Sequence, residues 1–147
     1  MTAEKEDEDL DIKEFLSRGY MIEREIKELE AEKKKAFTMC TVHGAAGDIK
    51  VQSSPRNSVD ERLADYASYS DEIDKALRQL IRAKREIFNV IRGVKNNTYR
   101  YILEMRYVRF QTWESIAETS GYAIRHVHRL HKRALAAAAA VLDTSEN

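Results

Sequence analysis

Basic side chains recur on one face of the segment 124–135, where the chain reads IRHVHRLHKRAL. His128 and Arg129 follow Arg125 by three and four residues, and Lys132 follows them by four and three, spacings that put side chains on the same face of an α-helix. Apolar side chains stand between them, at Val127, Leu130 and Ala134. A helix that buries its apolar face and exposes a basic one can lie in the DNA major groove, with its first residues near base edges. We therefore predict a DNA-reading helix that begins near Ile124 and continues past Leu135.

The residue types divide this face into base contacts and phosphate contacts. Arg125 and Arg129 can each pair bidentately with guanine, and Ile124 can touch a thymine methyl group. With His128, these residues form the predicted base-edge set, Ile124, Arg125, His128 and Arg129. Phosphate contacts position a protein without reading the sequence. For them we predict Arg109, Thr112, Lys132 and Arg133, with backbone N–H groups at the helix start after Thr112 as further donors.

Two shorter helices are predicted ahead of the reading helix, at about 98–108 and 113–118. The Thr112 hydroxyl can cap the second one by accepting a hydrogen bond from its first turn. Gly121, which can adopt positive φ, ends it. Two helices joined by such a tight turn form a helix-turn-helix. We expect the large indole of Trp113 to be a packing group beneath the turn.

The run EMRYVRFQTWESIAETSGYAIRHVHRLHKRAL resembles two groups of DNA-binding proteins. The part TWESIAETSGY…RHVHRLHKRAL looks like region 4 of sigma-70-type factors. The whole run is similar to the ArpU/RinA-type late-gene transcription regulators of phages and prophages. That resemblance implies promoter DNA as the ligand and RNA polymerase as a possible partner. Those regulators usually carry Ser where Ala123 stands, so the N-cap here is weaker by roughly 1 kcal/mol.

Other chemistries fit the sequence less well. His126, His128 and His131 are spaced two and three apart, and only His128 and His131 share a helix face, so we favour phosphate donors or packing groups over a zinc site. The lone Cys40 with His43 supplies too few ligands for a structural zinc. The chain contains no Gly-rich phosphate loop, G-x-S-x-G or H-E-x-x-H motif. We therefore expect no enzymatic activity, cofactor or bound metal.

Composition limits the compartment and the partners. The 147 residues include 25 acidic and 25 basic side chains, one Pro and five Gly, which favours a nearly all-helical chain. Residues 1–32 hold 12 acidic against five basic side chains, whereas residues 95–133 hold eight basic against three acidic. This division indicates a local polyanion-binding face. With no signal peptide, no membrane-spanning run and a single Cys, we expect a protein of the bacterial host's cytoplasm.

The rest of the chain predicts long helices. Apolar residues at alternating spacings of three and four favour helices over about 10–37 and 59–94, separated by a loop at 38–57 with a short extended piece near 49–51. We predict an acidic, disordered tail at 1–9, an antiparallel coiled-coil hairpin at 10–95, the helix-turn-helix domain at 96–142 and a tail at 143–147. The second helix could also pair with another copy. The Ala run after Leu135 needs only its helix propensity as an explanation, although small side chains also permit close packing, for example in a homodimer.

The predicted protein is therefore all-α, with a long N-terminal helical hairpin and a C-terminal three-helix domain similar to sigma region 4. The predicted function is sequence-specific binding of double-stranded DNA to regulate transcription of phage or prophage genes. Two alternatives remain open. One is the DNA-recognition subunit of a phage packaging machine (a small-terminase-like protein), which combines a helix-turn-helix with a helical oligomerisation segment. The other is a coiled-coil adaptor that binds proteins alone.

Overall fold

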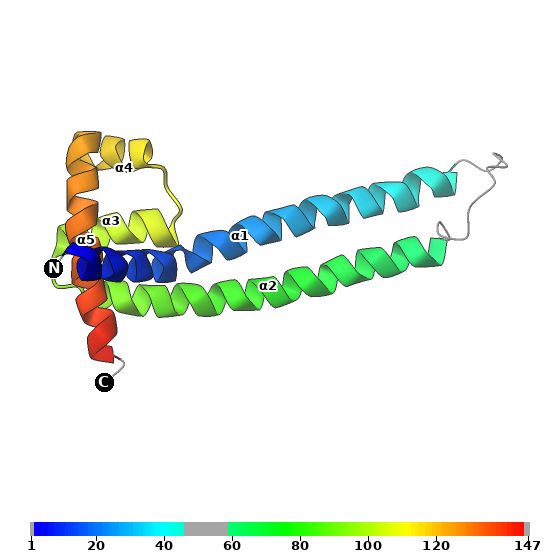
Figure 1. The fold of residues 1–147 in the computed structure, drawn as a ribbon. Helices are drawn as coiled ribbons and strands as arrows, with labels where there is room; N and C mark the ends of the chain where they lie inside the picture. The colour runs from blue at the N-terminus through cyan, green and yellow to red at the C-terminus, as the bar shows by residue number, and fades with distance from the viewer. Residues whose placement is uncertain (1, 46–58, 146–147) are drawn as a thin grey trace. The chain divides into compact units, whose positions relative to one another are not determined.

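The computed structural model describes residues 2–45 and 59–145, and all of the regular structure in these ranges is helical. The elements are α1 (Thr2–Ala45), α2 (Val59–Gly93), α3 (Asn97–Leu103), the π-helical segment η1 (Glu104–Val108), α4 (Trp113–Ser120) and α5 (Ile124–Ser145) (Figure 1). The predicted all-α class is confirmed. No helix in the described ranges is long and apolar enough to cross a membrane.

The first helix is longer than the sequence predicted at both ends. It begins at Thr2, so residues 2–9 are helical and not disordered. The sequence of this stretch is rich in Asp and Glu, residue types that are favourable near a helix N-terminus because the helix dipole is positive there. It continues to Ala45, into the predicted loop, because elongation adds one hydrogen bond per residue once a helix has formed. The rest of that loop, with the predicted extended piece at 49–51, lies outside the described residues. The last helix likewise extends past residue 142 to Ser145.

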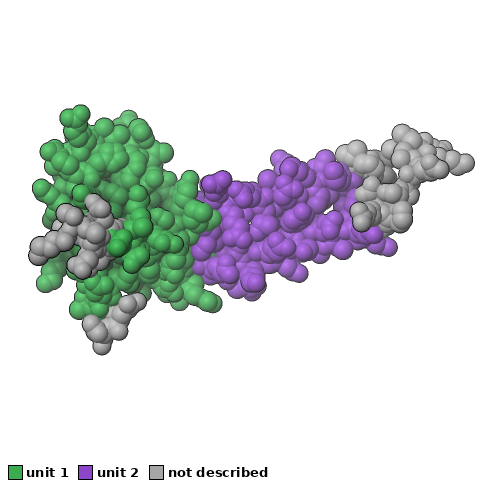
Figure 2. Space-filling model, viewed as in Figure 1, with its two compact units in different colours: residues 1–21, 80–147 green, residues 22–79 purple. Residues whose placement is uncertain are grey.

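The chain divides into two compact units whose boundary crosses both long helices (Figure 2). Unit 1 comprises residues 1–21 and 80–147, and unit 2 comprises residues 22–79. The sequence had instead predicted a single boundary near residue 95. The difference arises because the end of α2 and the start of α1 contribute their apolar side chains to the core that also holds α5.

In unit 2, the two helical segments run antiparallel and make few buried contacts. The rings of Phe37 in α1 and Tyr66 in α2 are tilted at 45° with centroids 6.0 Å apart, while Ile26, Ile73 and Ala76 are buried. The alternating spacing of three and four that predicted α2 includes Val59, Leu63 and Leu77, yet all three side chains are exposed. The buried positions in and just after α2 are Ile73, Ala76, Ala83, Ile87, Val90, Ile91 and Val94, so Ala76 is buried where the expected stripe has Leu77.

Unit 1 contains the main hydrophobic core. Its members come from five elements: Ile12 and Leu16 of α1, Ile87, Val90, Ile91 and Val94 in and just after α2, Leu103 of α3, Tyr107 of η1, and Ala134, Leu135 and Ala138 of α5. Figure 1 shows α5 crossing the ends of the other helices. Full burial of each large aliphatic side chain contributes about 1.5–3 kcal/mol. The core thus holds the C-terminal half of α5 firmly in place.

Small side chains allow α5 to approach α2 closely. Ala134 and Ala138 are fully buried, so part of the Ala run packs within its own chain. Gly93, the last residue of α2, lies beside Val141 of α5: a Cβ atom built on Gly93 would be 2.5 Å from Cγ1 of Val141. Real Cβ atoms do not approach other heavy atoms so closely. Gly93 therefore leaves the space that Val141 occupies.

We expect Gly93→Ala to lower the free energy of unfolding by about 1–3 kcal/mol, because the added methyl group overpacks the contact with a β-branched, stiff side chain. Urea denaturation measures this change. Gly19→Ala is the matched control, since a Cβ there would lie 3.5 Å from the Phe110 ring, an ordinary contact. Its helical position should leave stability equal or raise it by up to about 1 kcal/mol. Equal stability of the Gly93→Ala variant and the wild type would contradict the close approach.

Candidate nucleic-acid interface

Local hydrogen bonds define the ends of the short helices. The Asn96 side chain accepts from the backbone N–H groups of Thr98 and Tyr99 at 2.9 and 3.1 Å, which caps α3. The Thr112 hydroxyl accepts from the N–H of Ser115 at 3.2 Å, so its predicted role as the cap of α4 is confirmed. Gly121 ends α4 with φ of 73°, as its type predicted. These caps set where α4 stops and where the chain turns into α5.

The connection before α4 departs from the predicted regular helix. After Leu103 the backbone widens into η1, in which the N–H of Arg109 donates to the carbonyl of Glu104 at 3.0 Å. Phe110 then adopts φ of 55°, the left-handed region that a bulky residue rarely occupies. Its ring packs edge-on against Tyr20 of α1 at 5.9 Å, with the Lys84 ammonium of α2 4.6 Å from its centroid. Phe110 thus fastens the segment before α4 to both long helices.

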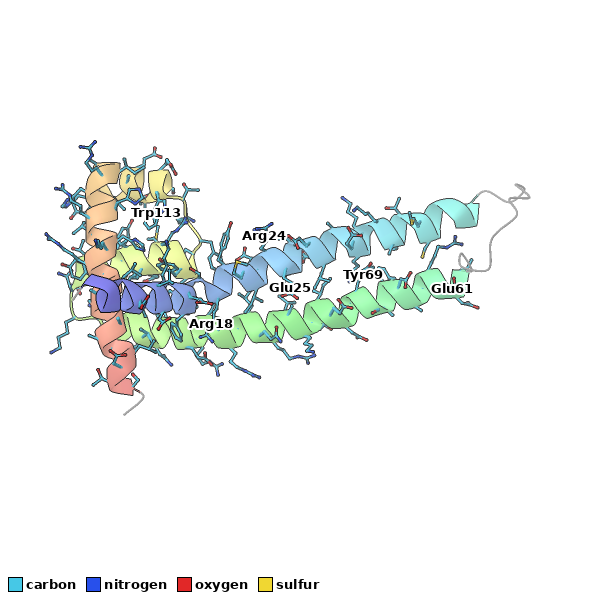
Figure 3. All side chains as sticks on the ribbon, in the orientation of Figure 1. Arg18, Arg24, Glu25, Glu61, Tyr69 and Trp113 are labelled. Carbon is cyan, nitrogen blue, oxygen red and sulfur yellow. The ribbon has the colours of Figure 1, made fainter. Side chains whose placement is uncertain are left out.

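The faces of α4 and α5 that meet are apolar. Ile116 of α4 and Val127 of α5 are fully buried, as their helical spacing predicted. Trp113, at the start of α4, packs its indole against His128 and His131 of α5 with centroids 4.9 and 4.6 Å apart (Figure 3). The guanidinium of Arg106 also lies over the indole, 4.5 Å from the centroid of the Trp113 ring. The predicted packing role of Trp113 agrees with these contacts.

The opposite side of α5 is exposed and basic. The four predicted base-edge residues, Ile124, Arg125, His128 and Arg129, are all exposed, and so are Lys132 and Arg133. Arg129 has a weak contact with the ring of His126, at 3.4 Å. Among the described residues, no carboxylate forms an ion pair with a basic side chain of α5. These cations are therefore available to an external anion.

Two predicted phosphate contacts, Arg109 and Thr112, are exposed but have partners within the chain. The Arg109 guanidinium donates to Glu104 at 3.1 and 3.2 Å, and the Thr112 hydroxyl already caps α4. The Arg109 pair is exposed to solvent, so it contributes less than about 1 kcal/mol and can exchange for a phosphate. Ala123 offers no side-chain acceptor, yet α5 begins at Ile124 as predicted. The backbone carbonyl of Ala123 accepts from the N–H groups of His126 and Val127 at 2.8 and 3.0 Å.

His131 has a structural role that its spacing did not reveal. Its imidazole is buried, and Nε2 shares a 2.7 Å hydrogen bond with the Tyr107 hydroxyl of η1. Burial lowers the pKa of His131 to about 4, and the nearby cations Lys13, Arg106 and His128 act in the same direction. Burial also raises the pKa of Tyr107 to about 12. The neutral pair joins η1 to α5 across the core. Tyr107 lies 24 residues away in the sequence, and no local pattern signals such a pairing.

The three histidines of α5 contact different partners. His126 packs edge-on against Tyr122 at 5.1 Å, His128 lies on Trp113, and His131 bonds to Tyr107. In the described ranges, no three His, Cys, Asp or Glu side chains are grouped so as to hold a metal ion. The exposed cations of α5 offer an anion electrostatic and hydrogen-bonding contacts.

The buried His131 makes stability depend on pH. Its pKa is near 4 in the folded chain against 6.5 when exposed, so only the unfolded chain takes up a proton between these values. Neutral His131 therefore adds about 3 kcal/mol to the free energy of unfolding above pH 6.5, and this contribution is lost as the pH falls to about 4. Urea denaturation across this range should show that loss for the wild type and a flatter profile for His131→Phe. His126→Phe, at a more exposed ring, should keep the wild-type slope, and a His131→Phe profile with the same slope would contradict the assignment.

Comparison with known proteins identifies a family but no characterised relative. A family model described as "Protein of unknown function (DUF1492)" matches residues 40–137. The match includes all of α2, α3, η1 and α4 and the basic part of α5. No curated protein matches the chain, and no solved structure does. Because the family model covers two thirds of the chain, this protein belongs to the DUF1492 family.

Proposed function

We propose that this protein is a transcription regulator that binds double-stranded DNA sequence-specifically, through a helix-turn-helix formed by α4, the turn at Gly121 and α5. The observation that carries the proposal is the division of α5 into two faces. Val127, His131 and Ala134 face the core, while Arg125, Arg129 and Lys132 are exposed and have no carboxylate partner among the described residues. A recognition helix needs one face packed against its own domain and another face that is cationic and free to contact DNA.

The dimensions of the exposed face suit a major groove. Residues 124–133 span about 15 Å at 1.5 Å per residue, comparable with the roughly 12 Å width of the groove. Arg125 and Arg129 lie one turn apart near the start of α5, where a docked recognition helix contacts base edges. His128 is exposed at the edge of this face, next to Ile124, where its ring also packs on Trp113 of α4. Lys132 and Arg133 lie one turn further along, where side chains approach the phosphate backbone.

The preceding elements support the same proposal by fixing the helix. Trp113 and Ile116 hold α4 against α5, and Phe110 fastens the segment before α4 to α1 and α2. A reading helix held this rigidly loses little conformational freedom when it binds, which favours affinity. Residues 10–95 would form a helical hairpin that carries the helix-turn-helix of residues 96–142. The resemblance to ArpU/RinA-type regulators and to sigma region 4 suggests phage or prophage genes as targets, RNA polymerase as a partner and the bacterial cytoplasm as the place of action.

The first experiment is selection of random duplex DNA by the full chain at two salt concentrations. A specific reader should enrich one motif, and its affinity should fall steeply as salt rises, because bound phosphates release counterions. Absence of binding even at low salt would contradict the proposal and favour a protein-binding adaptor. A selection without an enriched motif but with salt-dependent binding would contradict sequence-specific reading.

With a motif in hand, Arg125→Ala and Arg129→Ala should each weaken binding to it by about 1–3 kcal/mol and relax the preference at one base pair. Lys132→Ala should weaken binding to all sequences alike and reduce the salt slope by about one. Arg24→Ala is a matched control, because Arg24 is an exposed cation of α1 that pairs with Glu28 at 3.2 Å (Figure 3). Fluorescence anisotropy measures all four variants. Equal affinity of the α5 variants and the Arg24 control would contradict the assigned contacts.

A further inference from the structure

Apolar side chains on the outer faces of α1 and α2 in unit 1 are exposed to solvent. On α1, Leu10 is 64% exposed and Met21 is 59% exposed; on α2, Ile81 is 60% and Phe88 is 38% exposed. The members of each pair are separated by eleven and seven residues, close to three and two complete helical turns. Each pair therefore shares one face of its helix. The inner faces of the same segments, with Leu16 and Ile87, are fully buried.

Charges of opposite sign flank these two faces. Exposed acidic side chains lie beside the apolar face of α1, at Asp7, Asp11 and Glu14. Exposed arginines lie beside that of α2, at Arg82, Arg85 and Arg92. No ion pair joins any of these six side chains to another described residue. Like charges three or four residues apart, such as Arg82 with Arg85 or Asp7 with Asp11, destabilise an isolated helix.

The charge pattern of these segments differs from that of α1 in unit 2. There, Arg24 pairs with Glu28 and Lys27 with Glu23, each four residues apart and each at 3.2 Å. The segment 80–95 holds a single acidic residue, Glu86, which pairs with Arg18 of α1 at 2.7 Å (Figure 3). Opposite charges on the two helices thus already bind each other within one chain, while the outer charges lack such partners.

We propose that a second copy of this chain covers both faces. The acidic face of α1 in each copy would pack against the basic face of α2 in the other copy. A two-fold interface must be self-complementary, so one surface must carry both of its halves. The four apolar side chains would be removed from water, and the flanking charges would pair as they do beside the apolar seam of a coiled coil. The aliphatic stems of the arginines would add apolar cover. The faces also match in length, since residues 7–21 and 81–92 span about 21 and 17 Å at 1.5 Å per residue.

A nucleic acid fits the same surface less well. Phosphates would pair with Arg82, Arg85 and Arg92, but they would leave Ile81 and Phe88 in water. The acidic face of α1 would repel phosphates, and its exposed apolar side chains would stay in water. A second copy satisfies both faces at once. The dimer itself does not depend on the proposed DNA binding; if that function also holds, the dimer would carry two α5 helices and select a target of two-fold symmetry.

Charge reversal on each face tests the interface. Sedimentation equilibrium of the full chain should show a dimer that weakens as salt rises. The double variant R82E/R85E should raise the dimer dissociation constant by on the order of tenfold or more, because two like-charged faces would then meet. The double variant D11R/E14R, which reverses the acidic face of α1, should raise the dimer dissociation constant by a similar factor. An equimolar mixture of the two variants should form a heterodimer, since each acidic face again meets a basic one.

Controls separate this interface from DNA reading and from misfolding. R125E/R129E carries the same charge change as R82E/R85E and should remain dimeric while losing DNA affinity. R82E/R85E should still enrich a single half-site if the proposed function holds, and circular dichroism should show wild-type helix content for every variant. Three results would each overturn the proposed interface: a wild-type chain that is monomeric at all concentrations, a dimer unaffected by either reversal, and two monomeric variants that do not associate when mixed.

Discussion

The burial of the C-terminal half of α5 in the hydrophobic core is the interaction on which the rest of unit 1 depends. Ala134 and Ala138 have no solvent exposure, and Gly93 leaves room for Val141. At Gly93 the backbone of α2 comes close to α5. Side chains of α1 and α3 contribute to the same core. The exposed half of the same helix carries the basic face. Because an α-helix is stiff over this length, the core that holds one half also orients the other.

A second attachment, which is partly polar, holds the other end of the candidate interface. The hydrogen bond between Tyr107 and His131 lies inside an apolar core, where breaking it would leave a buried polar group without a partner, at a cost of about 1–3 kcal/mol. Apolar side chains alone would tolerate small rotations of α5, whereas a 2.7 Å hydrogen bond selects one rotation. Phe110 adds a contact that its own backbone opposes, since φ of 55° is unfavourable for a bulky residue. The surrounding packing must outweigh that strain.

Electrostatics divides the chain although its net charge is zero. The start of α1 is acidic, whereas the end of α2 and the first half of α5 are basic. Separate fields of opposite sign steer binding partners over distances near the Debye length, about 10 Å at 0.1 M salt. The basic surface of α5 suits a polyanion, and the exposed large apolar side chains next to it are Tyr122 and Ile124. On the basic face of α2, the arginines alternate with Ile81 and Phe88, so this face suits a protein helix of opposite charge.

The sequence by itself determined the local features of this protein. Helix periodicity predicted the all-α class, Thr112 and Gly121 marked the ends of α4, and the spacing of Arg125, His128 and Arg129 placed them on one exposed face. Each of these features depends on neighbours within about one helical turn. Tertiary structure decided the rest: the extension of α1 to Thr2 and Ala45, the burial of His131 on Tyr107, the π-helical segment, and the unit boundary that crosses both long helices. These features depend on contacts between residues far apart in the chain, which no local pattern encodes.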